Sequence, residues 1–142
     1  MKKATEYFMQ GYSCSESIVK AAIEKGLVNE NILPLASPFS GGLSSGCLCG
    51  AVAGMQLVFG SMFGRDDKDR NGMIARKLAK KSIEMFKEKN KYTCCKALTA
   101  GYDIASPERK QHCVKMVETC AEIVEELIKQ PVANLFGSQQ AD

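Results

Sequence analysis

Apolar residues recur at helical spacing along most of the chain, and no window shows the sustained alternation of a β-strand. The two longest amphipathic stretches run from about residue 67 to 90 and from 106 to 129. Asp66 or Asp67 can cap the first stretch. Ser106, followed by Pro107 at the first helical position, caps the second. We predict an all-α fold of about four to six helices.

The N-terminal region predicts a short helix over Lys2 to Gln10, interrupted by Gly11. Ser13 and Glu16 have the spacing of a capping box, so a second helix starts there and runs to about Lys25. Cys14 then lies in the first turn of that helix.

The middle of the chain carries no charged residue from Asn31 to Phe63. Asn31 to Ala36 can form one or two helical turns, and Pro38 to Gly46 is a glycine-rich loop by composition. The apolar stretch from Cys47 to Phe63 has about the minimum length for a membrane span, but its glycines and a glutamine make it only mildly hydrophobic. We therefore predict a central buried helix and no membrane insertion.

Gly46, Gly50 and Gly54 recur every four residues and leave one face of this helix nearly free of side chains. Another helix of the chain, a second copy of the chain, or a cofactor can approach such a face closely. Gly50 and Gly54 are therefore candidate cofactor-binding residues, and a homodimer is compatible with the sequence.

The remaining sequence predicts a short helix that Thr93 caps, which contains Cys94 and Cys95 and ends near Gly101. We expect residues 1–130 to form one helical domain and the polar segment 131–142 to be a loose tail.

Net charge and the N-terminal sequence argue against two classes of function, nucleic-acid binding and export. A formal net charge of +3 is too small to indicate nucleic-acid binding. The N-terminus lacks the apolar segment of an export signal, so we expect a cytoplasmic protein.

The chain has seven cysteines, several at predicted helix starts, where the helix dipole and unpaired N–H groups favour thiolates. Thiolates bind metals and attack disulfides. No two cysteines have Cys-x-x-Cys spacing, and the Cys-x-x-Cys-His motif of covalent haem attachment is absent, so we expect no covalent haem.

Four sequence elements, in order, resemble the family of redox-active proteins named for the signature C_GCAxxG_C_C. They are Gly11-Tyr12-Ser13-Cys14, then Cys49-Gly50-Ala51-Val52-Ala53-Gly54 after the glycine-rich loop, then Cys95-Lys96-Ala97-Leu98-Thr99, and finally Cys113. The resemblance implies a small, soluble, helical redox protein whose family cysteines are Cys14, Cys49, Cys95 and Cys113. Cys94 is an alternative to Cys95, while Cys47 and Cys120 lie outside the signature.

Three hypotheses remain open. Cys14, Cys49, Cys95 and Cys113 could hold an iron–sulfur cluster or another metal such as zinc, for electron transfer with an unidentified redox partner protein. Alternatively, Cys49 could act as the nucleophile of a thiol–disulfide oxidoreductase, with Cys14 or Cys95 resolving the mixed disulfide. In a non-catalytic helical interaction module, the cysteines would be buried structural residues. We expect His112, the one histidine, to be a surface residue.

Overall fold

The computed structural model describes residues 1–131 and 134, and within them the only strand-like pairing is an isolated antiparallel bridge between Leu48 and Cys94. The all-α prediction is therefore confirmed. The elements are α1 (Lys3–Gln10), α2 (Cys14–Glu24), the 3₁₀-helix η1 (Glu30–Phe39), the π-type turn η2 (Gly42–Gly46), α3 (Gly50–Phe63), α4 (Met73–Asn90), α5 (Cys95–Leu98) and α6 (Pro107–Lys129). Most of the predicted tail, 131–142, lies outside the described residues.

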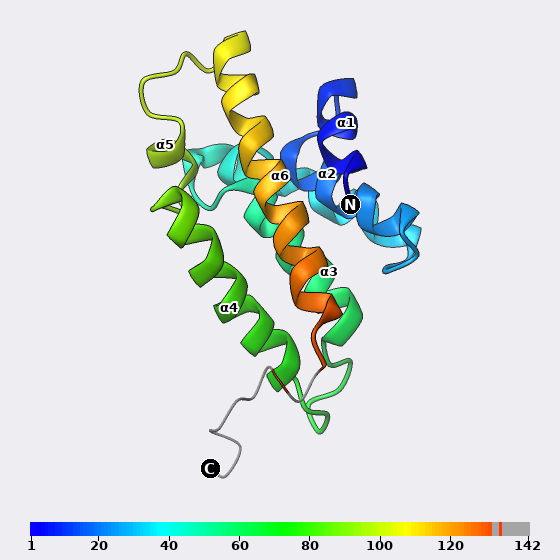
Figure 1. The fold of residues 1–142 in the computed structure, drawn as a ribbon. Coiled ribbons are helices and arrows are strands. Elements are labelled where there is room, and N and C mark those ends of the chain that lie inside the picture. The colour runs from blue at the N-terminus through cyan, green and yellow to red at the C-terminus, as the bar shows by residue number, and fades with distance from the viewer. Residues whose placement is uncertain (132–133, 135–142) are drawn as a thin grey trace.

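The helices pack around α3, the predicted central buried helix. Figure 1 shows α6 crossing α3, with α4 on one side and with α1 and α2 on the other. The first three turns of α3 are almost fully buried, and α2 is its closest neighbour. The largest fully buried side chains come from α2, α3, α4 and α6: Ile18, Met55, Phe59, Leu78, Phe86, Ile123 and Leu127. Their burial supplies most of the free energy that holds the helices together.

The predicted helix caps of α2 and α6 are both present. The Ser13 hydroxyl accepts from the Glu16 N–H at 3.3 Å, and the Glu16 carboxylate accepts from the Ser13 N–H at 2.9 Å. At α6 the Ser106 hydroxyl accepts from the Arg109 N–H at 3.1 Å, with Pro107 at the first helical position. These contacts satisfy backbone donors that a helix start leaves unpaired.

The predicted start of α4 is wrong, because α4 begins at Met73 and not beside Asp66 or Asp67. Asp66 pairs with Arg70 at 3.1 Å, and the Asp67 carboxylate accepts from the Asp69 N–H at 2.9 Å. The two carboxylates therefore stabilise a turn before the helix, which is a common use of aspartate.

The boundaries of two other helices, η1 and α5, also differ from the prediction. Helix η1 runs on to Phe39, so it includes Pro38, which the sequence assigned to the loop. Thr93 does not cap α5: the residue before the helix is Cys94, and α5 ends at Leu98 and not near Gly101. The Thr93 carbonyl instead accepts from the Cys49 N–H at 2.7 Å.

No helix in the described part of the chain combines the length and the apolar character that crossing a membrane requires. The apolar run that raised this question forms α3, which is only 14 residues long and lies in the core.

Candidate functional site

The site begins with the glycine-rich segment before α3, which turns back on itself through left-handed backbone. Gly41, Gly42 and Gly46 have φ between 64° and 72°, and the non-glycine residues Leu43 and Ser44 adopt φ of 61° and 54°. A Cβ at Gly42 would lie 2.7 Å from the Cβ of Cys95. The loop therefore packs directly on the start of α5, and only glycine fits at this contact.

Backbone pairing fixes the starts of α3 and α5 next to each other. Around the Leu48–Cys94 bridge, the Cys49 N–H donates to the Thr93 carbonyl at 2.7 Å and the Cys95 N–H donates to the Cys47 carbonyl at 2.5 Å. Figure 1 shows α5 beside the segment that leads into α3. Two sequence regions more than forty residues apart thus bring Cys49 and Cys95 to one place.

The start of α2 adds Cys14 to this group. A Cβ at Gly50 would clash with the Cys14 sulfur, so the glycine after Cys49 allows that sulfur to approach the first turn of α3. The backbone N–H groups of Gly41 and Ser15 also hydrogen-bond to the Cys14 sulfur. The family glycine therefore has a definite role beside the thiols.

Together these elements enclose a cavity of about 70 Å³, called here the four-cysteine cavity, which α6 closes with Cys113. Cys49 and Cys95 are buried, and Cys14 and Cys113 are half-buried. The structure thus brings together the four cysteines identified by the family resemblance. The other residues that line the four-cysteine cavity are Phe8, Gly41, Gly50, Leu98, Thr99, Arg109 and Met116.

The other three cysteines do not line this cavity. Cys47 and Cys94 are exposed, and the Cys94 thiol donates to the Gly46 carbonyl at 3.2 Å. Cys120 is fully buried in the core. Of the adjacent pair, Cys95 and not Cys94 therefore faces the site.

Burial controls the protonation of the thiols. It raises the pKa of Cys49 to about 12, although the N–H groups of Val52 and Ala51 at the start of α3 oppose this. Burial likewise raises the pKa of Cys14, against the N–H groups of Gly41 and Ser15. At both positions, desolvation therefore raises the thiol pKa more than the N–H groups of the helix start lower it. A cation close to a buried sulfur would oppose this effect of burial.

Arg109 was not predicted from the sequence as a site residue, and among the described residues it is the one charged residue that lines the cavity. Its Nη2 lies 3.7 Å from the Cys95 sulfur, and its charge lowers the pKa of Cys113, which burial raises. Arg109 precedes Cys113 by four residues on α6, so both lie on one helix face. That spacing is the signal that could have identified it.

The second family glycine and the histidine have structural contacts. Gly54 does not line the cavity: a Cβ there would lie 2.7 Å from the Ser15 carbonyl oxygen of α2. The glycine face that suggested a homodimer is therefore covered by α2 of the same chain at Gly50 and Gly54. His112 is half-buried, stacks on Tyr102 at 4.9 Å, and has Nε2 2.8 Å from the Leu98 carbonyl oxygen.

The metal-binding side chains around the cavity, and how close together they lie, indicate which kind of metal centre could fit. Among the described residues, four cysteines and no histidine or carboxylate line the cavity, a set that suits zinc or iron–sulfur centres. In the described chain, however, no three Cys, His, Asp or Glu side chains lie close enough together to hold one metal ion. The type of donor therefore fits such a centre, whereas the spacing of the side chains in this structure does not fit a single ion.

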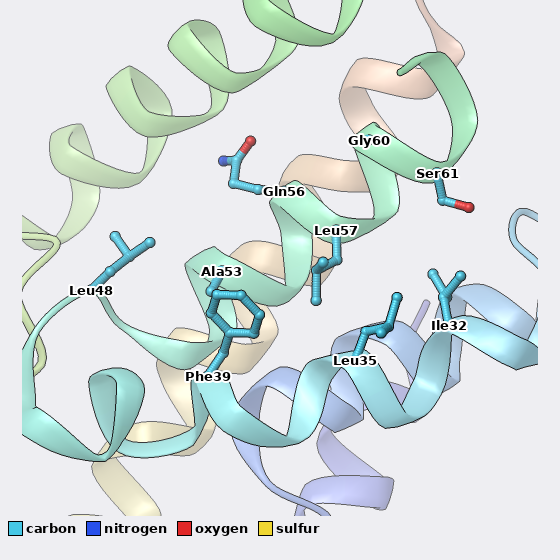
Figure 2. Close-up of a pocket in the computed structure, with 9 residues that line it drawn as sticks. All are labelled: Ile32, Leu35, Phe39, Leu48, Ala53, Gln56, Leu57, Gly60 and Ser61. Atoms are coloured by element: carbon cyan, nitrogen blue, oxygen red, sulfur yellow. The ribbon is translucent and has the colours of Figure 1, made fainter. Parts of the chain in front are cut away.

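A larger groove of about 360 Å³ lies between η1 and α3 (Figure 2). Its walls are mostly aliphatic or aromatic, with Phe39 and Leu57 prominent, and no cysteine or charged residue of the described chain lines it. None of the four family cysteines therefore lies in this groove.

The fold and the cavity define a small helical protein with a buried four-thiol site. A family model described as "Putative redox-active protein (C_GCAxxG_C_C)" matches residues 12–127, and the chain belongs to this family. No curated protein and no solved structure shows significant similarity to it.

Proposed function

We propose that this redox-active protein transfers electrons through an iron–sulfur cluster held by Cys14, Cys49, Cys95 and Cys113. The observation that carries the proposal is that all four cysteines line one cavity, although they lie in α2, α5 and α6 and directly before α3. Thiolates are the usual ligands of iron–sulfur clusters. Such a cluster, when bound, would supply one-electron chemistry.

The protein's own groups would support such a centre in two ways. Backbone N–H groups of Gly41, Ala51 and Val52 face the sulfurs of Cys14 and Cys49 and would hydrogen-bond to them. The Arg109 guanidinium beside Cys95 would offset part of the negative charge of four thiolates. Both interactions tune the reduction potential of a cluster.

The burial of the sulfurs also favours electron transfer over thiol attack. Cys49 is 6% exposed and Cys95 is 8% exposed, so a substrate disulfide can reach either sulfur only after the site opens. Electrons move between redox centres without a bond forming between them. A redox partner protein therefore needs only to approach the site.

Thiol–disulfide exchange is a second candidate, and the contact between Arg109 and Cys95 favours it, because the guanidinium can hydrogen-bond to a sulfur that takes part in exchange. Cys95 would attack a substrate disulfide, losing its proton, forming a mixed disulfide and releasing one substrate thiolate. A second cavity cysteine would then attack Cys95 and release the other thiolate. The protein pair is oxidised and the substrate disulfide is reduced. The raised pKa of Cys49 disfavours that residue as the attacking thiol.

The test is to purify the full chain anaerobically, supply iron and sulfide, and measure iron, sulfide and the visible spectrum. We expect near-stoichiometric cluster with charge-transfer bands, both lost in Cys49→Ser and Cys113→Ser. Cys47→Ser and Cys94→Ser are matched controls, because these two cysteines are exposed and do not line the cavity, and both should retain the cluster. A colourless, metal-free wild type whose free-thiol count falls in pairs on mild oxidation would favour exchange instead.

A further inference from the structure

A second cavity, of about 500 Å³, adjoins the four-cysteine cavity at the surface and is called here the vestibule. It is lined by Phe8 of α1, by residues 104–106, and by Pro107, Arg109, Lys110 and Cys113 of α6. Phe8, Arg109 and Cys113 line both cavities. A molecule in the vestibule would therefore lie beside one of the four family cysteines.

The vestibule is positively charged. Of the described residues, Arg109 and Lys110 line it, and no aspartate or glutamate does. Within the same part of the chain, neither cation forms an ion pair with a carboxylate. The Arg109 side chain makes two long contacts with described residues, from Nη1 to the Ile104 carbonyl at 3.4 Å and from Nη2 to the Cys95 sulfur at 3.7 Å. A guanidinium has five N–H donors, so most of its hydrogen-bonding capacity is available to a ligand.

Apart from Ser106, the other residues that line the vestibule are apolar. Ile104 is 87% exposed, an unusual position for a large aliphatic side chain, and Pro107 lies close to it in sequence. The Phe8 ring also lines the vestibule, with the Lys110 ammonium 5.5 Å from the ring centre. The volume is within the range of about 300–1,000 Å³ that is typical of small-molecule sites.

We propose that the vestibule binds a small organic anion. Its carboxylate or other oxyanion would pair with Arg109 and Lys110, and its apolar part would contact Phe8 and Ile104. Assigning this ligand as a substrate of the redox site rests on the proposed function, whereas the binding itself does not.

The test is calorimetric titration of the full chain with 2-naphthoate, and with 2-naphthalenemethanol as the neutral analogue. We expect 2-naphthoate to bind at least about tenfold more tightly than the alcohol, because the charge-assisted hydrogen bonds are lost in the alcohol. Arg109→Gln should weaken naphthoate binding about tenfold and Lys110→Gln several-fold, while Arg109→Lys should restore part of the affinity. Lys115→Gln removes the same charge from an exposed site on α6 outside the vestibule and should bind like the wild type.

Equal affinity for the acid and the alcohol would overturn the proposal, as would unchanged binding in Lys110→Gln and Arg109→Gln. Binding of a glutamate-rich peptide in place of naphthoate would also overturn it, because the site would then receive a protein segment. Iron content is measured on the same samples, which separates the two hypotheses. Iron-free protein that binds naphthoate contradicts only the cluster, and cluster-containing protein that does not bind it contradicts only the vestibule site.

Discussion

At the scale of single residues, Gly50 is the position where sequence and site are most tightly linked. The Cys14 sulfur occupies the space where a side chain at Gly50 would begin. Gly60, in the same helix, differs in its surroundings: it is exposed, and a Cβ there would have no neighbour within 4 Å. Substitution by alanine should therefore have opposite effects on stability at the two glycines.

Gly50→Ala should lower the free energy of unfolding by about 1–3 kcal/mol, because the methyl group overpacks a closed site. It should also reduce the iron bound per chain, because the Cys14 sulfur must move away from the cavity. Gly60→Ala should raise the free energy of unfolding by up to about 1 kcal/mol, since alanine favours the helix. Urea denaturation followed by circular dichroism measures both effects. Equal effects at the two positions would contradict the packing described at Gly50.

The four cysteines that share the cavity were identified from the sequence through a family resemblance. The family resemblance selected Cys14, Cys49 and Cys113, and it favoured Cys95 over Cys94 from the residues that follow. It did not indicate Arg109, because the signature consists of cysteines and small residues. Nor did it indicate how far burial raises the thiol pKa values, since desolvation depends on neighbours from every part of the fold.

At the scale of elements, Glu16 connects two of them. One carboxylate oxygen accepts from the Ser13 N–H in the α2 capping box, and the other accepts from the Ser37 hydroxyl of η1 at 2.8 Å. The Ser13 N–H is the main reason that the pKa of Glu16 is lowered, and the Ser37 hydroxyl adds to it, while burial opposes both. The contact fixes the start of α2, where Cys14 lies.

A lowered pKa in the folded state has a defined consequence for stability. The contribution of Glu16 is complete above its unfolded pKa of about 4.5 and is lost as the pH falls through the lower, folded pKa. Glu16→Gln should therefore destabilise the protein at neutral pH, and the difference from wild type should shrink below about pH 4.5. Thermal unfolding across this range measures the difference. Glu84→Gln, on the exposed face of α4, is the control, and a pH-independent difference for Glu16→Gln would contradict the capping role.

Helix starts were predictable where their caps are unambiguous, as at Ser13 and Ser106. The start of α4 was not, because an aspartate stabilises an isolated turn as readily as a helix start, and Asp67 does the former. The turn η2 was also beyond prediction. Its left-handed residues Leu43 and Ser44 adopt a conformation that non-glycine residues rarely use, so tertiary contacts must fix it.

At the scale of the whole molecule, the four cysteines lie far apart in sequence, and only the packed bundle brings them together. Pairing around Leu48 and Cys94 joins two of the helix starts, and the small face of α3 allows α2 to approach. Helix α6 then closes the cavity with Cys113. The all-α class followed from periodicity alone, but the cavity and its vestibule depend on which helices meet, and periodicity does not specify that.

The measurement that tests the central claim most directly is an anaerobic redox titration of the iron- and sulfide-loaded full chain, followed by its visible spectrum. We predict charge-transfer bands that bleach reversibly in a one-electron step, with the free-thiol count unchanged. A protein without visible bands that takes up two electrons per chain, and gains two free thiols on reduction, would contradict the cluster and establish disulfide chemistry at the four-cysteine cavity.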